Sequence, residues 1–224
     1  MKKALILLIV LFLVSFVSAE CFTPRSSTSL AIIEDTILCK GEYYLPYGIQ
    51  IVGDNIHLDC NGAIINGNNS KKIPLNRYGY DNTSIENCRI YNYQSSINEW
   101  ADADNSILRN NYFFNIRGII VGGKNNIIEK NHIIQSGFGI YLSKASNSLI
   151  SKNEIDSIRE GIFLFMSYNN TIIKNDIKTI DNPIVYITWY SSNNQFIKNK
   201  FVNNWEVIEH PYSENNTFIK NIFK

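Results

Sequence analysis

The chain has 224 residues, of which 45% are hydrophobic, and its formal net charge at pH 7 is +1. This length suits one domain, and the hydrophobic content is enough for a continuous apolar core. The near-neutral total gives no strong general attraction to a polyanion, which disfavours nucleic acid as a partner.

The N-terminus has the pattern of a signal peptide. Two lysines precede an apolar run over residues 4–17, and a small-residue cleavage site ends at Ala19. We expect cleavage after Ala19, so that residues 1–19 are the signal peptide and residues 20–224 are the mature domain. An uncleaved membrane anchor is the alternative, but the apolar run is shorter than the roughly 20 residues that span a bilayer.

Export would place the mature chain in an oxidising compartment, where cysteines form disulfides. All four cysteines lie in the N-terminal half of the chain, at Cys21, Cys39, Cys60 and Cys88. Four cysteines allow three pairings. Their clustering predicts bonds that hold the first part of the fold together, and we expect the pairs Cys21–Cys39 and Cys60–Cys88.

From residue 82 onward the chain repeats a pattern that reads apolar, x, x, Asn, x, apolar. The central positions are Cys88, which replaces asparagine in the first copy, and Asn111, Asn131, Asn153, Asn175, Asn199 and Asn221. Successive central positions are 23, 20, 22, 22, 24 and 22 residues apart. Seven copies at a nearly fixed period indicate a solenoid built from one structural unit.

A second element lies between successive copies of this pattern. Gly118, Gly139 and Gly161 each begin a short Gly-Ile strand, and Pro183 and Trp205 stand at the same phase in the last two periods. Each period therefore holds two or three short strands, joined by turns rich in Asn, Ser and Gly. Such strands satisfy their backbone hydrogen bonds when each pairs with the equivalent strand one turn later.

These patterns predict an all-β fold, a single-stranded right-handed parallel β-helix of about eight coils of roughly 22 residues each. A leucine-rich horseshoe needs leucine columns and a helical side, whereas β-branched Ile and turn-forming Asn prevail in this chain. A helical solenoid needs a 3.6-residue period, and none occurs. We expect the central asparagines to be structural, with amides that hydrogen-bond to the neighbouring coils.

The two ends of the solenoid are less regular than its middle. Residues 29–39 and 56–65 have the pattern of two earlier coils, and the longer spacing after them predicts that residues 66–81 bulge outward. The last copy of the repeat ends beside Lys224 without an obvious cap. We expect this terminal coil to pair with a partner, including a second copy of the chain, or to remain an exposed edge.

The stretch from Asp54 to Gly62, the segment from Asn82 to Cys88 and the Gly-Ile coils resemble archaeal exported proteins built from parallel β-helix repeats. These proteins belong to the broad pectin-lyase-like superfamily and are often grouped with the NosD-type periplasmic copper-binding β-helix proteins. The resemblance covers residues 21–224. It implies a cell-surface or periplasmic role, with carbohydrate binding in some members and sugar-polymer cleavage in others.

An enzyme that cleaves acidic polysaccharides on such a fold needs carboxylates from neighbouring coils together with a Lys or Arg base. We do not expect a column of aspartates at one-period spacing in this chain. The candidate cluster is Glu99, Asp102 and Asp104 in one turn, flanked by Arg89 and Arg109. Asp102 and Asp104 could bind calcium, but we favour the interpretation that they form a solvated turn.

The residues do not favour copper binding either. Met166 is the only methionine besides the initiator, and His57, His132 and His210 are widely separated in the sequence. These residues do not form a copper ligand set. We therefore expect no metal and no other cofactor.

One column of side chains on the outer surface could bind a ligand. In the Gly-Ile strands Ile140 and Leu142 point inward, so Tyr141 points outward. Its expected equivalents are Ile120, Phe163, Val185 and Val207, with Trp189, Tyr190 and Trp205 near the C-terminal end. We take Tyr141, Phe163, Trp189 and Trp205 as the candidate ligand-binding residues, because exposed aromatic side chains can stack on sugar rings or dock a protein. The alternatives are that a loop covers this column or that β-propensity alone selects its residues.

A second column consists of the lysines that precede the central asparagines or their equivalents, namely Lys130, Lys152, Lys174, Lys198 and Lys220. Ammonium groups one coil apart, about 5 Å, repel one another. An anionic polymer could offset this repulsion, and so could solvent together with carboxylates such as Glu154 and Asp176. We favour a solvated charged edge that opposes aggregation of the sheets.

The sequence thus predicts a secreted, extracytoplasmic β-helix module without catalytic residues. We expect it to bind a polysaccharide or a cell-envelope protein through its outer face. The alternative is a carbohydrate-active enzyme, a lyase or hydrolase, with Asp102, Asp104 and Arg109 as its candidate residues.

Overall fold

The computed structural model describes residues 20–224 except 27–28, 78, 99–102, 182 and 204–205. The predicted signal peptide, residues 1–19, therefore lies outside the described residues, as do Glu99, Asp102 and Trp205. No helix in the described part of the chain is long and apolar enough to cross a membrane.

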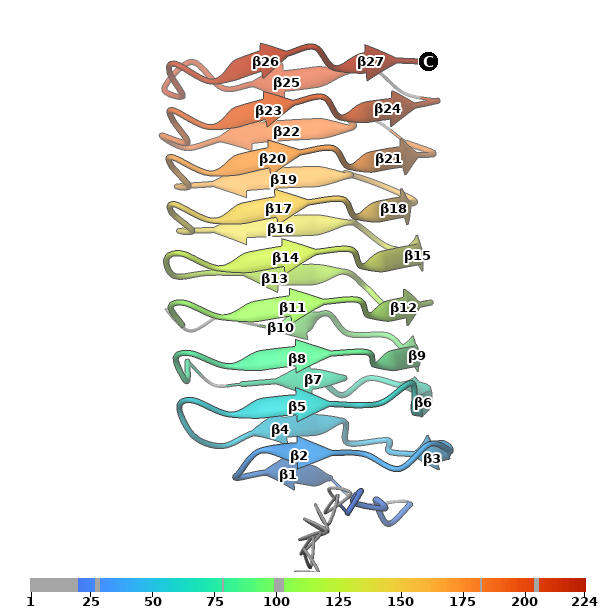
Figure 1. The fold of residues 1–224 in the computed structure, drawn as a ribbon. Helices are drawn as coiled ribbons and strands as arrows, with labels where there is room; N and C mark the ends of the chain where they lie inside the picture. The colour runs from blue at the N-terminus through green and yellow to red at the C-terminus, as the bar shows by residue number, and fades with distance from the viewer. Residues whose placement is uncertain (1–19, 27–28, 78, 99–102, 182, 204–205) are drawn as a thin grey trace, which may run out of the picture.

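The described chain is a stack of coils in which each coil contributes one strand to each of three parallel sheets (Figure 1). Sheet 1 contains β1 (Leu30–Ile32), β4 (Ile49–Ile51), β7 (Leu75–Asn76), β10 (Ile97–Asn98), β13 (Ile119–Val121), β16 (Ile140–Ser143), β19 (Ile162–Phe165), β22 (Val185–Thr188) and β25 (Val207–Glu209). Sheet 2 contains β2 (Thr36–Ile37), β5 (His57–Asp59), β8 (Ser84–Glu86), β11 (Ile107–Arg109), β14 (Ile127–Glu129), β17 (Leu149–Ser151), β20 (Thr171–Ile173), β23 (Gln195–Ile197) and β26 (Thr217–Ile219). Sheet 3 contains β3 (Glu42–Tyr44), β6 (Ile64–Ser70), β9 (Arg89–Tyr93), β12 (Tyr112–Phe114), β15 (His132–Ser136), β18 (Glu154–Ser157), β21 (Asp176–Thr179), β24 (Lys200–Val202) and β27 (Ile222–Phe223).

This architecture confirms the predicted parallel β-helix of about eight turns. The first and ninth strands of each sheet are eight turns apart, and each strand pairs in parallel with the equivalent strands of the coils below and above. The inward positions form columns of like residues. In sheet 2, for example, Ile128 pairs with Ile150, which pairs with Ile172, and all three are buried. Each such side chain contributes roughly 1.5–3 kcal/mol through its burial.

The turns between sheets depend on residues in the left-handed backbone region. Two of them recur in most coils, and Asn125 (φ 57°) and Lys130 (φ 55°) illustrate the pair. Asparagine tolerates this conformation better than other residues with a side chain. The doublet Asn125-Asn126 therefore has two separate roles, because Asn125 makes the corner while Asn126 is buried and hydrogen-bonds inside the solenoid.

The central asparagines form a continuous hydrogen-bonded ladder, as the repeat predicts. The Oδ1 atom of Asn153 accepts hydrogen bonds from the backbone N–H and the Nδ2 of Asn131, at 3.0 and 3.1 Å. The Nδ2 of Asn153 donates to the carbonyl oxygen of Ile128 at 2.9 Å and to Oδ1 of Asn175 at 3.0 Å. Every polar group of the buried amide is satisfied, which makes a polar column stable inside an apolar core.

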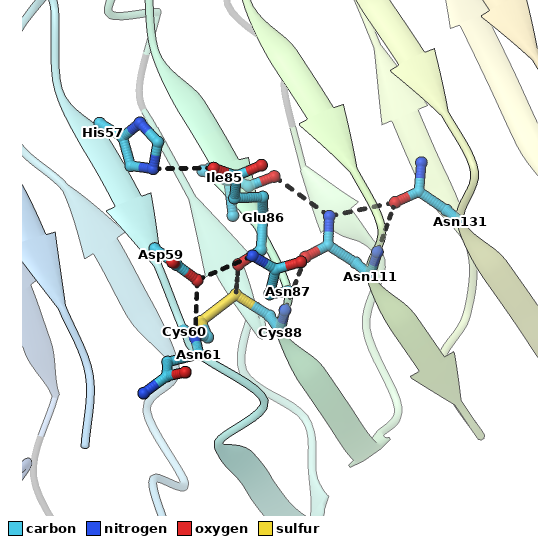
Figure 2. Close-up of a disulfide and its surroundings, with 10 residues drawn as sticks. All are labelled: His57, Asp59, Cys60, Asn61, Ile85, Glu86, Asn87, Cys88, Asn111 and Asn131. Carbon is cyan, nitrogen blue, oxygen red and sulfur yellow. Dashed lines mark hydrogen bonds and ion pairs between the residues drawn. A yellow bond between two sulfur atoms is a disulfide. The ribbon is translucent and has the colours of Figure 1, made fainter. Parts of the chain in front are cut away.

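A disulfide replaces this ladder at its N-terminal end (Figure 2). Cys60 is bonded to Cys88, and the backbone N–H of Cys88 donates to Oδ1 of Asn111, the first asparagine of the ladder. A second disulfide joins Cys21 to Cys39 in the first coil. Both bonds are the pairs expected from the sequence, and they lie in the coils where the repeat is least regular.

The bulge expected after the first two coils lies in β6 of sheet 3. Its register with β9 shifts between Asn66 and Ser70. The ring of Tyr93 lies against Gly67, where an added Cβ would come within 2.6 Å of the ring. Burial, the larger effect, and the nearby Tyr44 raise the pKa of Tyr93, whose hydroxyl donates to the carbonyl oxygen of Leu45.

Candidate functional site

A column of aromatic rings runs along the outer face of sheet 1. Tyr141 on β16 is paired with Phe163 on β19, which is paired with Tyr186 on β22. The ring centroids of Tyr141 and Phe163 are 4.5 Å apart, and those of Phe163 and Tyr186 are 5.2 Å apart. Burial raises the pKa of the Tyr141 hydroxyl, and a hydrogen bond with the Ser143 side chain partly opposes this effect.

The structure corrects the predicted members of this column in the last two coils. Val185 pairs with Ile162 and is fully buried, so it points into the core. The outward residues of these coils are Tyr186 and Ile208, which pair with each other. Val207 was likewise assigned to the wrong face, because it pairs with Val185. A shift of one residue moves every side chain of a strand to the opposite face.

Ile120 occupies the expected position next to Tyr141 in register. Its side chain is nevertheless only 6% exposed, so it is not accessible to a ligand on the outer surface. The accessible aromatic column therefore begins at Tyr141. Trp205, the remaining candidate, lies outside the described residues.

The aromatic column is extended by Phe138, which lies just before β16. The ring of Phe138 meets that of Tyr141 edge-on, with centroids 6.4 Å apart. Gly118 allows this arrangement, because it has φ +147° and a Cβ at that position would lie 2.3 Å from the Phe138 ring. The glycine that opens the Gly-Ile strand is therefore required by the ring that packs on it from the next coil.

Charged groups border these rings and enclose a shallow cleft of about 170 Å³. Its lining consists of Arg117, Phe138, Tyr141, Arg159, Glu160 and Phe163. Small-molecule pockets usually have volumes of about 300–1,000 Å³, so this cleft suits one ring of a longer molecule that lies across the surface. Sequence analysis missed Arg117, Phe138 and Glu160, although each directly precedes Gly118, Gly139 or Gly161 and the three recur once per period.

A second group of exposed rings lies at the C-terminal end of the same face. Phe165, on the outer side of β19, approaches Trp189 with ring centroids 6.4 Å apart. Trp189 and Tyr190 are 53% and 60% exposed, and Tyr190 stacks on Tyr212. Trp189 and Tyr190 have φ of 46° and 59°. Bulky residues rarely adopt this region, so the turn places two large rings in solvent at a conformational cost.

A polar cleft occupies the N-terminal end of sheet 1. It has a volume of about 460 Å³ and is lined by side chains that include Tyr47, Gln50, Lys71, Lys72 and Asn76. Gln50 and Asn76 are paired outward positions of β4 and β7. The outer face of sheet 1 therefore carries polar groups in its early coils and aromatic rings in its later coils.

The described members of the predicted carboxylate cluster are engaged within the solenoid. Oδ1 of Asp104 accepts the backbone N–H of Lys124 at 2.7 Å, and its own N–H donates to Oδ1 of Asp81 at 2.7 Å. Arg109 donates to Glu86 at 2.6 Å, and this hydrogen bond raises the pKa of the guanidinium. The N–H of Asp81 in turn donates to Oδ1 of Asp54 at 2.8 Å. Aspartates of three successive coils therefore form a column, contrary to the expectation from the sequence, and their carboxylates accept backbone N–H groups of the turns.

Glu86 joins two outward residues of sheet 2. It also accepts from Nε2 of His57 at 3.0 Å, and its side chain is only 12% exposed (Figure 2). The neighbouring Asp59 accepts the N–H of Asn61 at 2.7 Å and Nδ2 of Asn87 at 2.9 Å. These contacts tie β5, β8 and β11 together across the outer face of the early coils.

A scan of protein families matches residues 29–224 to the family described as "Periplasmic copper-binding protein (NosD)". The chain belongs to this family. The NosD family match covers nearly all of the described β-helix, and it agrees with the resemblance found in the sequence. No curated protein matches the chain.

Solved structures with this fold include DFA-IIIase from Arthrobacter chlorophenolicus A6. Its complex with GF2 has a TM-score of 0.66 at 14% identity, covering 86% of this chain and 55% of the other. Its complex with DFA-III has a TM-score of 0.55 at 16% identity, with coverages of 86% and 53%. The NosD-family chain thus spans about half the length of that enzyme. At identities this low the similarity shows the fold alone, a right-handed parallel β-helix.

Copper, which the NosD family description names, requires a set of soft or imidazole ligands in one place. All four cysteines form disulfides, so none of them can bind copper as a thiolate. His57 and His132 contact Glu86 and Glu154, and His210 stacks on Trp189. Among the described residues no three His, Cys, Asp or Glu side chains are arranged to hold a metal. The residues present do not fit a copper centre.

Proposed function

We propose that this NosD-family protein is an extracytoplasmic module that binds polysaccharide, without catalysing a reaction, through the outer face of sheet 1. The observation that carries the proposal is the column formed by Phe138, Tyr141, Phe163 and Tyr186, with ring centroids between 4.5 and 6.4 Å apart. Aromatic side chains present large apolar faces with a polar edge. Rings held one coil apart on a parallel sheet form a rigid platform for the apolar faces of successive sugar rings.

Two further features support a ligand surface in preference to ordinary sheet exposure. Trp189 and Tyr190 are held in a left-handed conformation that bulky residues rarely adopt, and both rings are more than half exposed. Arg117, Arg159 and Glu160 border the cleft and supply donors and acceptors for sugar hydroxyls. Rigid rings with a few polar groups at their edge are the usual composition of a small-molecule site.

A protein of the cell envelope is the other occupant that an exposed aromatic face would suit. The separate clefts in the early and the middle coils of sheet 1, of about 460 and 170 Å³, favour an elongated polymer. They lie on the same face, with β10 and β13 between them. A chain lying parallel to the solenoid axis would contact both.

The cellular location that we propose follows from the N-terminal signal pattern and the disulfides. Residues 1–19 would direct export of the chain 20–224 to the periplasm or to the surface of an archaeal cell. The two disulfides require an oxidising compartment to form. A periplasmic location of the NosD family is consistent with both.

The test is retention of the mature protein 20–224 on a panel of immobilised polysaccharides, compared with the Tyr141→Ala/Phe163→Ala variant. A matched control is Tyr91→Ala/Tyr112→Ala, which removes a pair of outward rings, 5.6 Å apart, from sheet 3. We expect the wild type and the control to be retained on the polysaccharide and the sheet 1 variant not to be retained. Circular dichroism should show that all three proteins are folded. Retention of the sheet 1 variant, or of none of the three, would remove the support for a polysaccharide site on this face.

A further inference from the structure

The five lysines of the second column occupy one corner of the solenoid, between sheets 2 and 3. Each follows a sheet 2 strand directly and precedes a ladder asparagine, and all five are exposed. Their backbones are stacked in register. Lys130, for example, donates its N–H to Ser151, the residue before Lys152, and the pattern continues to Lys220. The ammonium groups therefore form a line parallel to the solenoid axis with a repeat of about 5 Å.

The backbone at this corner does not favour lysine. All five lysines have φ between 53° and 56°. In the earlier coils the same corner is made by Asn61, Asn87 and Asn110, with φ of 50–57°. Asparagine adopts this region more readily than lysine does. Five successive lysines thus replace a better corner residue that the same chain uses elsewhere.

The nearby carboxylates do not neutralise the column. Glu154 pairs with His132 at 2.7 Å, and Asp176 pairs with Lys200 at 2.6 Å. Within the described residues, none of the five ammonium groups forms a salt bridge or a hydrogen bond with a side chain. Solvent and salt therefore screen their mutual repulsion, with no direct carboxylate partner among the described residues.

Protection against aggregation does not explain the position of the column. The open edges of the three sheets lie at the two ends of the stack, in β1–β3 and β25–β27 (Figure 1). Four of the five lysines lie in inner coils, along the side of the stack, where every strand is already paired. Lysines that block edge pairing would be needed on the terminal strands.

We infer that this lysine column is a binding site for a linear acidic polysaccharide that lies parallel to the solenoid axis. A line of evenly spaced, flexible ammonium groups matches a polymer with one anionic group per sugar, because each can reach a carboxylate or sulfate as a point charge. The residues that directly precede the lysines in sheet 2 are Glu129, Ser151, Ile173, Ile197 and Ile219, and none of them is aromatic. Single-stranded nucleic acid would require aromatic rings for its bases, so a polysaccharide is the better match.

The site is separate from the aromatic column of sheet 1 and does not rest on the function proposed for it. The decisive variant is Lys152→Asn/Lys174→Asn/Lys198→Asn, because asparagine suits the left-handed corner and folding should be preserved. Its matched control is Lys40→Asn/Lys124→Asn/Lys144→Asn, which removes the same charge from exposed lysines elsewhere. Lys144 also has a left-handed backbone, with φ 55°.

The probes are polygalacturonate, its fully methyl-esterified form and single-stranded DNA, each titrated at several salt concentrations. We expect the wild type and the control to bind polygalacturonate but not the esterified polymer. The column variant should bind it roughly tenfold more weakly at low salt, with a salt dependence reduced by about two released counterions. Tyr141→Ala/Phe163→Ala should bind polygalacturonate as the wild type does.

Three results would overturn the inference: no binding of polygalacturonate by the wild type, an equal loss in the control and column variants, or tighter binding of DNA than of polygalacturonate. Loss of panel binding by Tyr141→Ala/Phe163→Ala, with its binding of polygalacturonate unchanged, would support two separate sites on the two faces.

Discussion

The early and late coils of this solenoid have the same backbone path but are stabilised differently. In the early coils, disulfides and the contacts of Glu86 with His57 and Arg109 hold neighbouring strands together. In the late coils, the buried asparagine ladder does so from within. Because the ladder holds the late coils together from inside, their outward side chains are less constrained by stability. These are the coils where aromatic rings and lysines occupy the outer surface.

The largest effect should come from breaking the ladder in its middle. Asn153→Ala leaves the backbone N–H of Asn131 and the carbonyl oxygen of Ile128 without their partners in a buried site. Buried groups without partners destabilise a fold by about 1–3 kcal/mol each, so we expect a loss of roughly 2–6 kcal/mol in the free energy of unfolding from the two groups. Urea denaturation measures it. A loss below about 1 kcal/mol would show that the ladder does not stabilise the late coils.

Removing the Cys60–Cys88 bond tests the other half of the comparison. Cys60→Ala/Cys88→Ala opens a loop with a sequence separation of 28 residues, which should destabilise the early coils by about 3–4 kcal/mol. Hydrogen exchange should accelerate in β5 and β8 while β17 and β20 keep their protection, because each coil contacts only its neighbours. Uniform acceleration would mean that the two halves unfold as one unit. Peptide mapping under non-reducing conditions checks both pairings independently.

Alkaline pH should destabilise the bulge of the early coils through Tyr93. Burial raises its pKa in the folded state above that in the unfolded state, so its contribution is complete below about pH 10 and falls as the pH rises further. The loss should be about 1.4 kcal/mol for each pH unit above that point. In Tyr93→Phe this part of the pH dependence should disappear. Equal slopes for wild type and variant would contradict the burial of the hydroxyl.

The smallest effect should be a gain in stability. Lys174→Asn replaces a lysine with φ 56° by the residue that makes the same corner in earlier coils. We expect about 0.5 kcal/mol of stabilisation from relief of the backbone and of charge repulsion. Thermal melts at low and high salt separate the two causes, because only the repulsion is screened. Destabilisation would show that the lysine is needed for the fold.

The sequence predicts the backbone and core of the late coils better than it predicts which side chains lie on their outer surface. Period, inward columns and the asparagine ladder all follow from a repeat that occurs seven times. The outward residues of β22 and β25 were misassigned because Gly118, Gly139 and Gly161 have no glycine counterpart in those coils. Without that marker the phase is uncertain by one residue, which decides between Val185 and Tyr186.

Other features of the site are invisible in a linear pattern. The left-handed backbone of Lys174 and of Trp189 is a property of the corner and not of the residue type. The engagement of Glu154 by His132 depends on which outward residues meet across a sheet. Both facts support the inference that the lysine column is a binding site and not only a solvated edge.

The most direct test of the central claim is hydrogen–deuterium exchange on the mature protein with and without the polysaccharide that it retains. We expect new protection in β16, β19 and β22 and in the turn at Trp189 and Tyr190, with sheets 2 and 3 of the early coils unchanged. Protection confined to sheet 3, or the absence of any change on sheet 1, would contradict the assignment of polysaccharide binding to the aromatic face.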